Sequence, residues 1–262
     1  MDTRIIASFD GTPLAVHQLG AGDRPLLLLH GLFSTAEVNW VRPGTAARLA
    51  DAGWTVVMPD LRGHGQSGSP ADPEAWPEDV LARDTEAVVA ALRISDFGLG
   101  GYSLGARTVT RCLARGLRPS AAIIAGMGLS GITDVGPRGE WFIRMIEGRG
   151  TWKAGSSEFF AEAFMKANVP APENLLHLLR RQMNTPRSAL QALDVETLVV
   201  AGAEDFDNGS ARELAEALPR ARFAEVLPRA RFAEVPGTHM SAVTRPELAE
   251  AMLGFLEGLD ER

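Results

Sequence analysis

The sequence predicts an α/β protein with a mostly parallel, doubly wound sheet and an inserted helical cap. Apolar runs typical of buried strands alternate with amphipathic stretches typical of helices. The runs span 26–29, 54–58, 97–102, 121–125 and 197–201. This alternation implies right-handed crossovers between parallel strands. From 129 to 193 only helical patterns remain, which indicates the cap.

The remaining elements follow from local signals. Residues 4–8 and 14–19 are expected to form two strands joined across Asp10 and Gly11, a strong hairpin signal. Ser210, with Glu213 three residues later, predicts a capped helix start. Helices are expected at 43–52, 77–92, 106–115, 210–218 and 245–259, and in the cap at 141–146, 157–166, 173–183 and near Ser188. The predicted domains are a core of 1–128 and 194–262 around a cap of 129–193.

Composition excludes several classes of protein. The net charge of −7, without a basic run, argues against nucleic acid as a partner. The single cysteine, Cys112, cannot form an intrachain disulfide and is expected to pack inside its helix. The N-terminus lacks a signal-peptide pattern and no apolar run is long enough to span a membrane, so a cytoplasmic protein with a small-molecule substrate is expected.

The stretch 101–105, which reads GYSLG, is the central motif. It follows a predicted strand and precedes a predicted helix, the context of a nucleophile elbow. Gly101 and Gly105 lack Cβ atoms, so that strand and helix can approach closely around a strained Ser103. The Ser103 hydroxyl is then expected at the helix N-terminus, where free N–H groups can meet developing negative charge.

A serine hydroxyl needs a base and a group that orients the base. Of the five histidines, His239 follows the last predicted strand in a glycine-containing loop and is the best base. His17 and His177 are expected to be structural or solvent-facing, whereas His30 and His64 are expected to brace turns. For the acid, Asp205 is preferred and Asp207 is the reserve, and the order Ser103, Asp205, His239 fits one known hydrolase arrangement.

With these residues in place, the chain resembles the α/β-hydrolase superfamily along nearly its whole length. The matching motifs are His30-Gly31, the stretch 60–67, the stretch 101–105, Asp205 and His239. The resemblance implies an oxyanion hole from the N–H groups of Leu104 and Leu32, with Phe33 as the alternative to Leu32. In this superfamily, epoxide hydrolases and dehalogenases carry Asp at the elbow position. The serine at position 103 therefore counts against both of these activities.

The function expected is therefore a serine hydrolase of the carboxylesterase or lactonase type, cleaving an ester-like bond of a small, fairly apolar substrate. The same triad also serves carbon–carbon bond hydrolases and cofactor-free perhydrolases in this superfamily. A non-catalytic small-ligand receptor is the alternative from another class, because a fold does not determine a function.

Aromatic residues are expected to line the substrate pocket. Phe33 and Trp40 follow the oxyanion turn, and Trp141 and Phe142 begin a predicted cap helix. The cap also carries Phe159, Phe160 and Phe164, and of its five aromatics most are expected in the core of the cap and one or two in the pocket wall. No cofactor is expected, since the G-x-G-x-x-G match at 63–68 is not followed by a helix and neither a Walker loop nor a zinc-helix motif occurs.

A nine-residue segment, LPRARFAEV, occurs at 218–226 and again at 227–235. Two identical segments compete for one strand position. The second copy runs directly into the loop of His239, so residues 231–235 are expected to form the strand. The first copy is expected to be looped out, pairing at the sheet edge or mediating association such as a homodimer.

Overall fold

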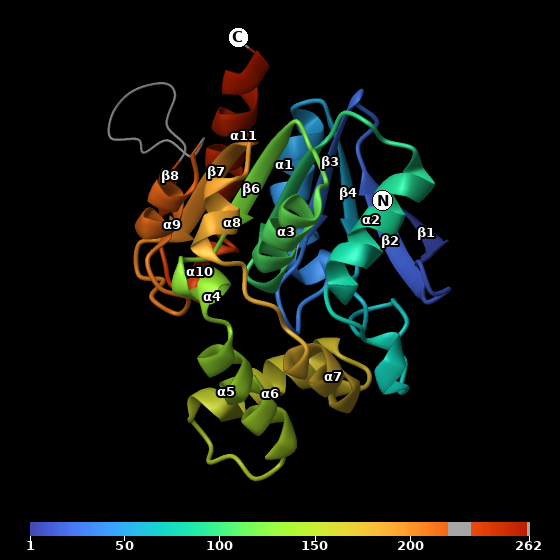
Figure 1. The fold of residues 1–262 in the computed structure, drawn as a ribbon, viewed down its shortest axis with the longest axis vertical. Helices are drawn as coiled ribbons and strands as arrows, with labels where there is room; N and C mark the ends of the chain where they lie inside the picture. The colour runs from blue at the N-terminus through green and yellow to red at the C-terminus, as the bar shows by residue number, and fades with distance from the viewer. Residues whose placement is uncertain (220–231, 261–262) are drawn as a thin grey trace.

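One sheet with helices on both faces organises the molecule (Figure 1). The computed structural model describes residues 1–219 and 232–260. Within them the strands are β1 (Asp2–Ala7), β2 (Pro13–Leu19), β3 (Arg24–Leu29), β4 (Trp54–Pro59), β5 (Gly98–Tyr102), β6 (Ala121–Ala125), β7 (Glu196–Gly202) and β8 (Phe232–Val235). Their order is β1-β2-β4-β3-β5-β6-β7-β8. The pairs β1·β2 and β2·β4 are antiparallel and the others are parallel, which confirms the predicted fold class.

Helices connect the strands and cover the sheet. The α-helices described are α1 (Thr45–Asp51), α2 (Val80–Leu92), α3 (Leu104–Arg115), α4 (Ser130–Thr133), α5 (Gly136–Glu147), α6 (Ser157–Asn168), α7 (Leu175–Arg180), α8 (Arg187–Gln191), α9 (Ala211–Ala217), α10 (His239–Ala242) and α11 (Pro246–Asp260). A π-helical turn, η1 (Glu37–Val41), and two 3₁₀ turns, η2 (Pro73–Ala75) and η3 (Pro172–Asn174), complete the described elements.

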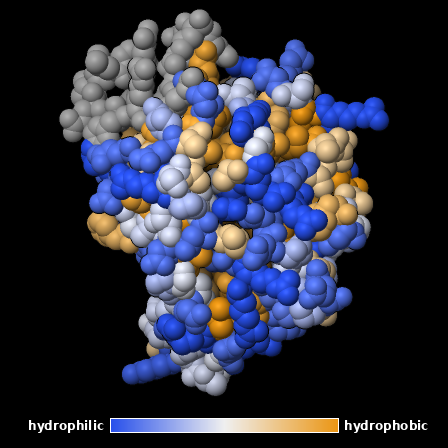
Figure 2. All heavy atoms as spheres, viewed as in Figure 1, coloured by the Kyte–Doolittle hydropathy of each residue, from blue (hydrophilic) through white to orange (hydrophobic). Residues whose placement is uncertain are grey.

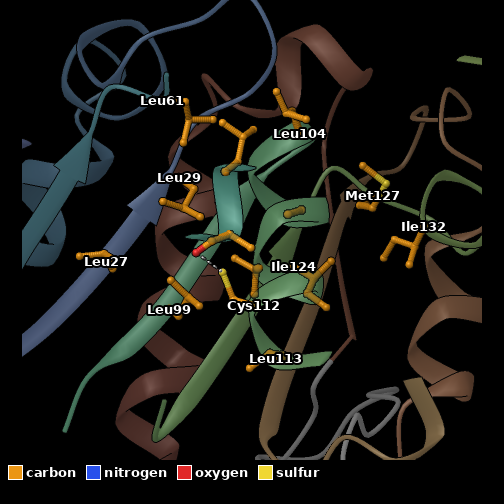
Figure 3. Packing of buried hydrophobic residues seen from close by; sticks show 14 of the residues in the cluster. Leu27, Leu29, Leu61, Leu99, Leu104, Cys112, Leu113, Ile124, Met127 and Ile132 are labelled. Atoms are coloured by element: carbon orange, nitrogen blue, oxygen red, sulfur yellow. Dashed lines mark hydrogen bonds between the residues drawn. The ribbon is translucent and has the colours of Figure 1, made fainter. Parts of the chain in front are cut away.

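The sheet has a hydrophobic core on each face. Leu27 and Leu29 of β3 point toward the core that includes α2 and α3, and Leu26 and Leu28 point toward the core that includes α1 and α11. All four side chains are fully buried, as a central parallel strand requires. Cys112 packs in the first core beside Leu99, Leu113 and Ile124 (Figure 3). Burial raises the pKa of its thiol to about 12, which keeps it protonated.

Between β6 and β7 the described elements are all helical. Helices α5, α6 and α7 lie together beyond the end of the sheet at which β6 stops and α4 begins (Figure 1). An ion pair between Arg138 of α5 and Asp207 in the loop after β7 joins this helical segment to the core, with 2.8 Å between Nη2 and Oδ2. The division into a core and a separate cap domain stays a prediction.

Several boundaries differ from expectation. Helix α2 begins at Val80, three residues after the predicted start, because Asp79 adopts a left-handed backbone with φ of 57°. Helix α7 ends at Arg180, short of the predicted 183, and a separate 3₁₀ turn precedes it. Ser210 caps α9 by accepting a hydrogen bond from the Glu213 N–H, as predicted.

The second copy of the repeat supplies β8, as predicted, and β8 pairs with β7 in parallel. The predicted looping-out and association of the first copy concern residues that, beyond Leu218 and Pro219, lie outside the described part of the chain. The face seen in Figure 2 is mostly hydrophilic with smaller hydrophobic areas. Among the described residues, no helix combines the length and the hydrophobicity that a membrane span requires.

Candidate active site

The turn between β5 and α3 holds Ser103 in a strained conformation. Its φ of 55° and ψ of −113° lie outside the regions that L-residues ordinarily occupy. A Cβ atom on Gly101 would lie 2.3 Å from the carbonyl carbon of Gly105, and one on Gly105 would lie 2.0 Å from the carbonyl oxygen of Leu29. The two glycines therefore permit the close approach of strand and helix that the elbow needs.

Three side chains that follow the carboxyl ends of β5, β7 and β8 form one chain of hydrogen bonds. Ser103 Oγ lies 3.0 Å from His239 Nε2, and His239 Nδ1 lies 2.8 Å from Asp205 Oδ2. The Asp205 carboxylate is almost fully buried, at 3% exposed, and the imidazole is 11% exposed. A carboxylate only accepts hydrogen bonds, so the arrangement assigns the proton to Nδ1 and leaves Nε2 free to accept from the serine hydroxyl.

Asp207, the reserve acid, lies elsewhere. Its side chain is 44% exposed and pairs with Arg138. Its backbone N–H donates to Asp205 Oδ1 at 3.3 Å, which helps to fix the buried carboxylate. The structure therefore places Asp205, and not Asp207, beside the imidazole.

The backbone N–H groups in the turn after β3 differ in whether they have an acceptor. The Gly31 N–H donates to Asn39 Oδ1, the Phe33 N–H to His64 Nε2 and the Ser34 N–H to the Gly31 carbonyl. Within the described residues the Leu32 N–H has no acceptor. Phe33, the alternative donor, is thus already engaged.

The second predicted donor is the N–H of Leu104. Leu104 is the first residue of α3, and the first N–H groups of a helix have no acceptor within it. Leu32 and Leu104, the residues expected to form the oxyanion hole, therefore each present an N–H without an acceptor among the described residues.

Two neutral histidines brace these loops. His64 Nδ1 donates to the Arg62 carbonyl, and His30 Nδ1 donates to the Gly31 carbonyl. His30 Nε2 accepts from the Leu61 N–H. Burial lowers the pKa of His64 to about 3 and also lowers the pKa of His30. Both rings stay uncharged and hold the loops, as predicted.

His17 and His177 also lie apart from the serine. His17 is buried and contacts Thr3 and Asp60, which fits the structural role expected for it. The His177 ring lies 6.5 Å from the Trp76 ring.

A cavity of about 120 Å³ opens beside Ser103 and His239. Apart from His239 and the phenol of Tyr102, the described residues of its wall carry no ionisable side chain. They are Gly31, Leu32, Ser34, Val38, Asn39, Tyr102, Phe164, Met240, Val243 and Thr244. The helical segment contributes Phe164, and the loop of His239 contributes Met240. The wall is mixed, neutral and largely apolar.

None of the four predicted pocket aromatics belongs to this described wall. The prediction for Trp40 is wrong, because η1 turns its ring into the core on the α1 side, where it is fully buried. Phe33 is 2% exposed and its ring packs edge-on against Phe142 at 5.5 Å, and Phe142 packs against Trp141 at 4.9 Å. These three rings link the turn after β3 to α5 instead.

Sequence reasoning missed two residues of the cavity that a simple signal could have found. Tyr102 and Met240 are the immediate chain neighbours of Ser103 and His239.

In the part of the chain that is described, no group of three or more His, Cys, Asp or Glu side chains could hold a metal ion.

Comparison with known proteins agrees with the fold. A family model described as the alpha/beta hydrolase fold matches residues 24–160, more than half of the chain. The chain therefore belongs to the α/β hydrolase fold family.

The curated relatives match only part of their own length. An epoxide hydrolase of Caballeronia sordidicola is 35% identical over 97 residues, which cover 37% of this chain and 28% of that protein. The matched stretch thus spans about a quarter to two fifths of the curated relatives' length.

Solved structures share the fold over nearly the whole chain. A hydrolase from Pseudomonas aeruginosa superposes with a TM-score of 0.76 at 22% identity, covering 97% of this chain and 98% of the other. An esterase from Exiguobacterium antarcticum gives a TM-score of 0.75 at 19% identity, covering 98% and 100%. At this level of identity the likeness is one of fold.

Proposed function

We propose that this chain is a serine hydrolase that cleaves an ester-like bond of a small, uncharged and fairly apolar substrate through an acyl-enzyme on Ser103. The observation that carries the proposal is the hydrogen-bonded line of Ser103, His239 and Asp205 beside the free N–H groups of Leu32 and Leu104. This combination supplies a nucleophile, a base, an orienting acid and donors for the oxyanion.

The reaction follows from these positions. Ser103 Oγ attacks the carbonyl carbon while His239 Nε2 takes the hydroxyl proton. Asp205 holds the Nδ1 proton and stabilises the imidazolium. The carbonyl oxygen becomes an oxyanion that accepts from Leu32 and Leu104, each donor being worth about 3 kcal/mol in comparable sites. His239 then protonates the leaving alcohol, and water activated by the same imidazole releases the acid from Ser103.

The cavity supports a neutral acyl or alcohol group. Its described wall offers Leu32, Val38, Phe164 and Val243 as apolar contacts, and apart from His239 none of its described side chains could pair with a charged substrate. The epoxide hydrolase activity named for the C. sordidicola protein is not adopted, because a serine rather than an aspartate stands at the elbow. A carbon–carbon bond hydrolase or a perhydrolase would use the same triad and differ in substrate.

The test is hydrolysis of short p-nitrophenyl esters by the wild type, by Ser103→Ala and by Ser120→Ala as a matched control. Ser120 precedes β6 at the far end of the sheet and bonds the Phe97 carbonyl. We expect Ser103→Ala to lose at least about a thousandfold in kcat and Ser120→Ala to retain wild-type activity.

A fluorophosphonate probe separates the alternatives. Labelling of Ser103 without ester turnover would point to a narrower substrate, such as a carbon–carbon bond. Neither labelling nor turnover in a folded wild type would overturn the proposal and favour a small-ligand receptor.

A further inference from the structure

Tyr102 ties the nucleophile strand to the loop that carries the base. It is the last residue of β5 and directly precedes Ser103. Its phenol hydroxyl donates a hydrogen bond of 2.7 Å to the backbone carbonyl of His239, across 137 positions of the chain. Asp205 orients the imidazole, whereas Tyr102 holds the backbone from which that imidazole projects.

The ring of Tyr102 has little freedom. It is 4% exposed and lies against Gly126, where an added Cβ would sit 2.6 Å from the ring. Gly126, with φ of 58°, thus leaves the space that the ring occupies. The ring centroid lies 5.5 Å from that of His239, with 41° between the planes. The position of Tyr102 at the end of β5, the space beside Gly126 and the hydrogen bond together restrict where the loop of His239 can lie.

We infer that Tyr102 is a positioning residue for His239, an inference that rests on the proposed function. The supporting elements of the base loop are short, since β8 and α10 have four residues each. A further anchor therefore matters for keeping Nε2 within reach of Ser103. A small displacement of a catalytic group lowers the rate steeply, because the reacting geometry is lost.

The chemistry of the phenol suits this role. Burial raises its pKa well above the ordinary value, and the nearby carboxylates of Asp205 and Asp207 raise it further. The phenol therefore keeps its proton and remains a donor at any pH at which the enzyme works. The imidazolium that forms during attack also faces an aromatic ring within about 6 Å, a distance at which rings attract cations.

Tyr102→Phe tests the hydrogen bond alone, because it removes only the hydroxyl and keeps the ring. We expect kcat to fall about tenfold while KM stays within about twofold of the wild type, since the ring still lines the cavity. Labelling of Ser103 by a fluorophosphonate should slow by the same factor. Thr110→Val is the matched control: it removes a buried hydroxyl that bonds the Ala106 carbonyl within α3, and it should change neither rate.

A second readout does not depend on turnover. The Nδ1 proton of His239, held by Asp205, is followed as a low-field proton NMR resonance. We expect it in the wild type and in Thr110→Val, and we expect it shifted or broadened in Tyr102→Phe because the imidazole is less firmly placed. Urea unfolding of each variant checks that the fold is retained.

Tyr102 is the only tyrosine in the chain, so its titration can be read directly from tyrosinate absorbance. An exposed phenol is about nine-tenths ionised one pH unit above its usual pKa of about 10, whereas the folded protein should show almost no tyrosinate there. Ordinary titration in the folded state would overturn the buried hydrogen bond.

The possible failures are distinguishable. A wild type that neither hydrolyses esters nor labels contradicts the proposed function, whatever Tyr102 does. Wild-type kcat together with an unchanged His239 resonance in Tyr102→Phe overturns the inference on Tyr102 and leaves the proposed function standing.

Discussion

Asn39 Oδ1 accepts a hydrogen bond from the backbone N–H of Gly31 at 3.0 Å. Asn39 lies in the π-helical turn η1 and is 4% exposed. Single π-turns are frequent at functional sites. The contact fixes the peptide between His30 and Gly31, which directly precedes the peptide that carries the Leu32 N–H. The amide nitrogen of Asn39 is buried and has no partner among the described residues, so the burial of this side chain carries an energetic cost.

Replacing Asn39 by Ala should therefore misalign the Leu32 N–H, which is one of the two donors proposed for the oxyanion. We expect kcat to fall about tenfold to a hundredfold, less than the full loss of such a donor, with a small change in KM. Steady-state ester hydrolysis measures both. Asn184→Ala is the control, since Asn184 Oδ1 accepts from the Val135 N–H in the helical segment, and it should leave kcat unchanged. An Asn39→Ala enzyme with wild-type kcat would show that the turn holds without this bond.

The elbow glycines make a prediction about stability. In Gly105→Ala the new methyl group would meet the Leu29 carbonyl oxygen at 2.0 Å, and neither backbone can move away easily. We expect a loss of about 3 kcal/mol or more in the free energy of unfolding. Gly254 lies exposed in α11 with nothing within 4 Å of such a methyl. Gly254→Ala should therefore be neutral or stabilise by up to about 1 kcal/mol. Urea titration compares the two, and equal midpoints would contradict the steric argument.

The sheet could be predicted from the sequence because strand position and burial are local signals. Leu26 to Leu29 read as a strand buried on both faces, and they fill both cores. The residues at the strand ends, Ser103, Asp205 and His239, could be placed together for a related reason. Parallel strands bring their carboxyl ends to one edge of the sheet, so the strand topology alone predicts that these residues lie close together.

The cavity wall could not be predicted in the same way. Trp40 follows the oxyanion turn, but the direction of its side chain depends on η1, which no sequence pattern announced. Phe164 reaches the cavity only because the helical segment folds back over the end of the sheet. Side-chain direction and the packing of distant segments are tertiary properties that periodicity does not encode.

A buried arginine holds the start of the chain against α2. Arg62 is fully buried and donates to Asp84 at 2.6 and 2.9 Å and to Asp10 at 2.6 and 3.0 Å. Ser8 also donates to Asp84. Removing the cation in Arg62→Met leaves the buried Asp84 carboxylate without its compensating charge.

We expect Arg62→Met to lose about 3–5 kcal/mol of unfolding free energy. The control is Arg180→Met, which breaks a pair with Glu147 in which both side chains are about half exposed. Such a pair is worth less than about 1 kcal/mol. Equilibrium unfolding measures both, and a loss as small for Arg62 as for Arg180 would show that the cluster tolerates the missing charge.

The buried His64 should make the fold sensitive to acid. Its pKa is about 3 in the folded protein and about 6.5 in the unfolded chain. Between these values the unfolded chain binds a proton that the folded protein does not, so falling pH favours unfolding. The contribution of neutral His64 to the free energy of unfolding is fully present above about pH 6.5. It is lost progressively below that pH, by about 2 kcal/mol at pH 5. Burial of His30 acts in the same direction.

His64→Gln removes the titrating group while keeping an oxygen that can accept from Phe33. Urea unfolding at about pH 7 and pH 5 should therefore show the free energy of the wild type falling by about 2 kcal/mol more than that of the variant. Each protein is compared with itself at the higher pH, so a constant loss of packing in the variant cancels. Equal falls in both proteins would mean that His64 gains its proton without unfolding, and that the turn between Phe33 and His64 opens locally in acid.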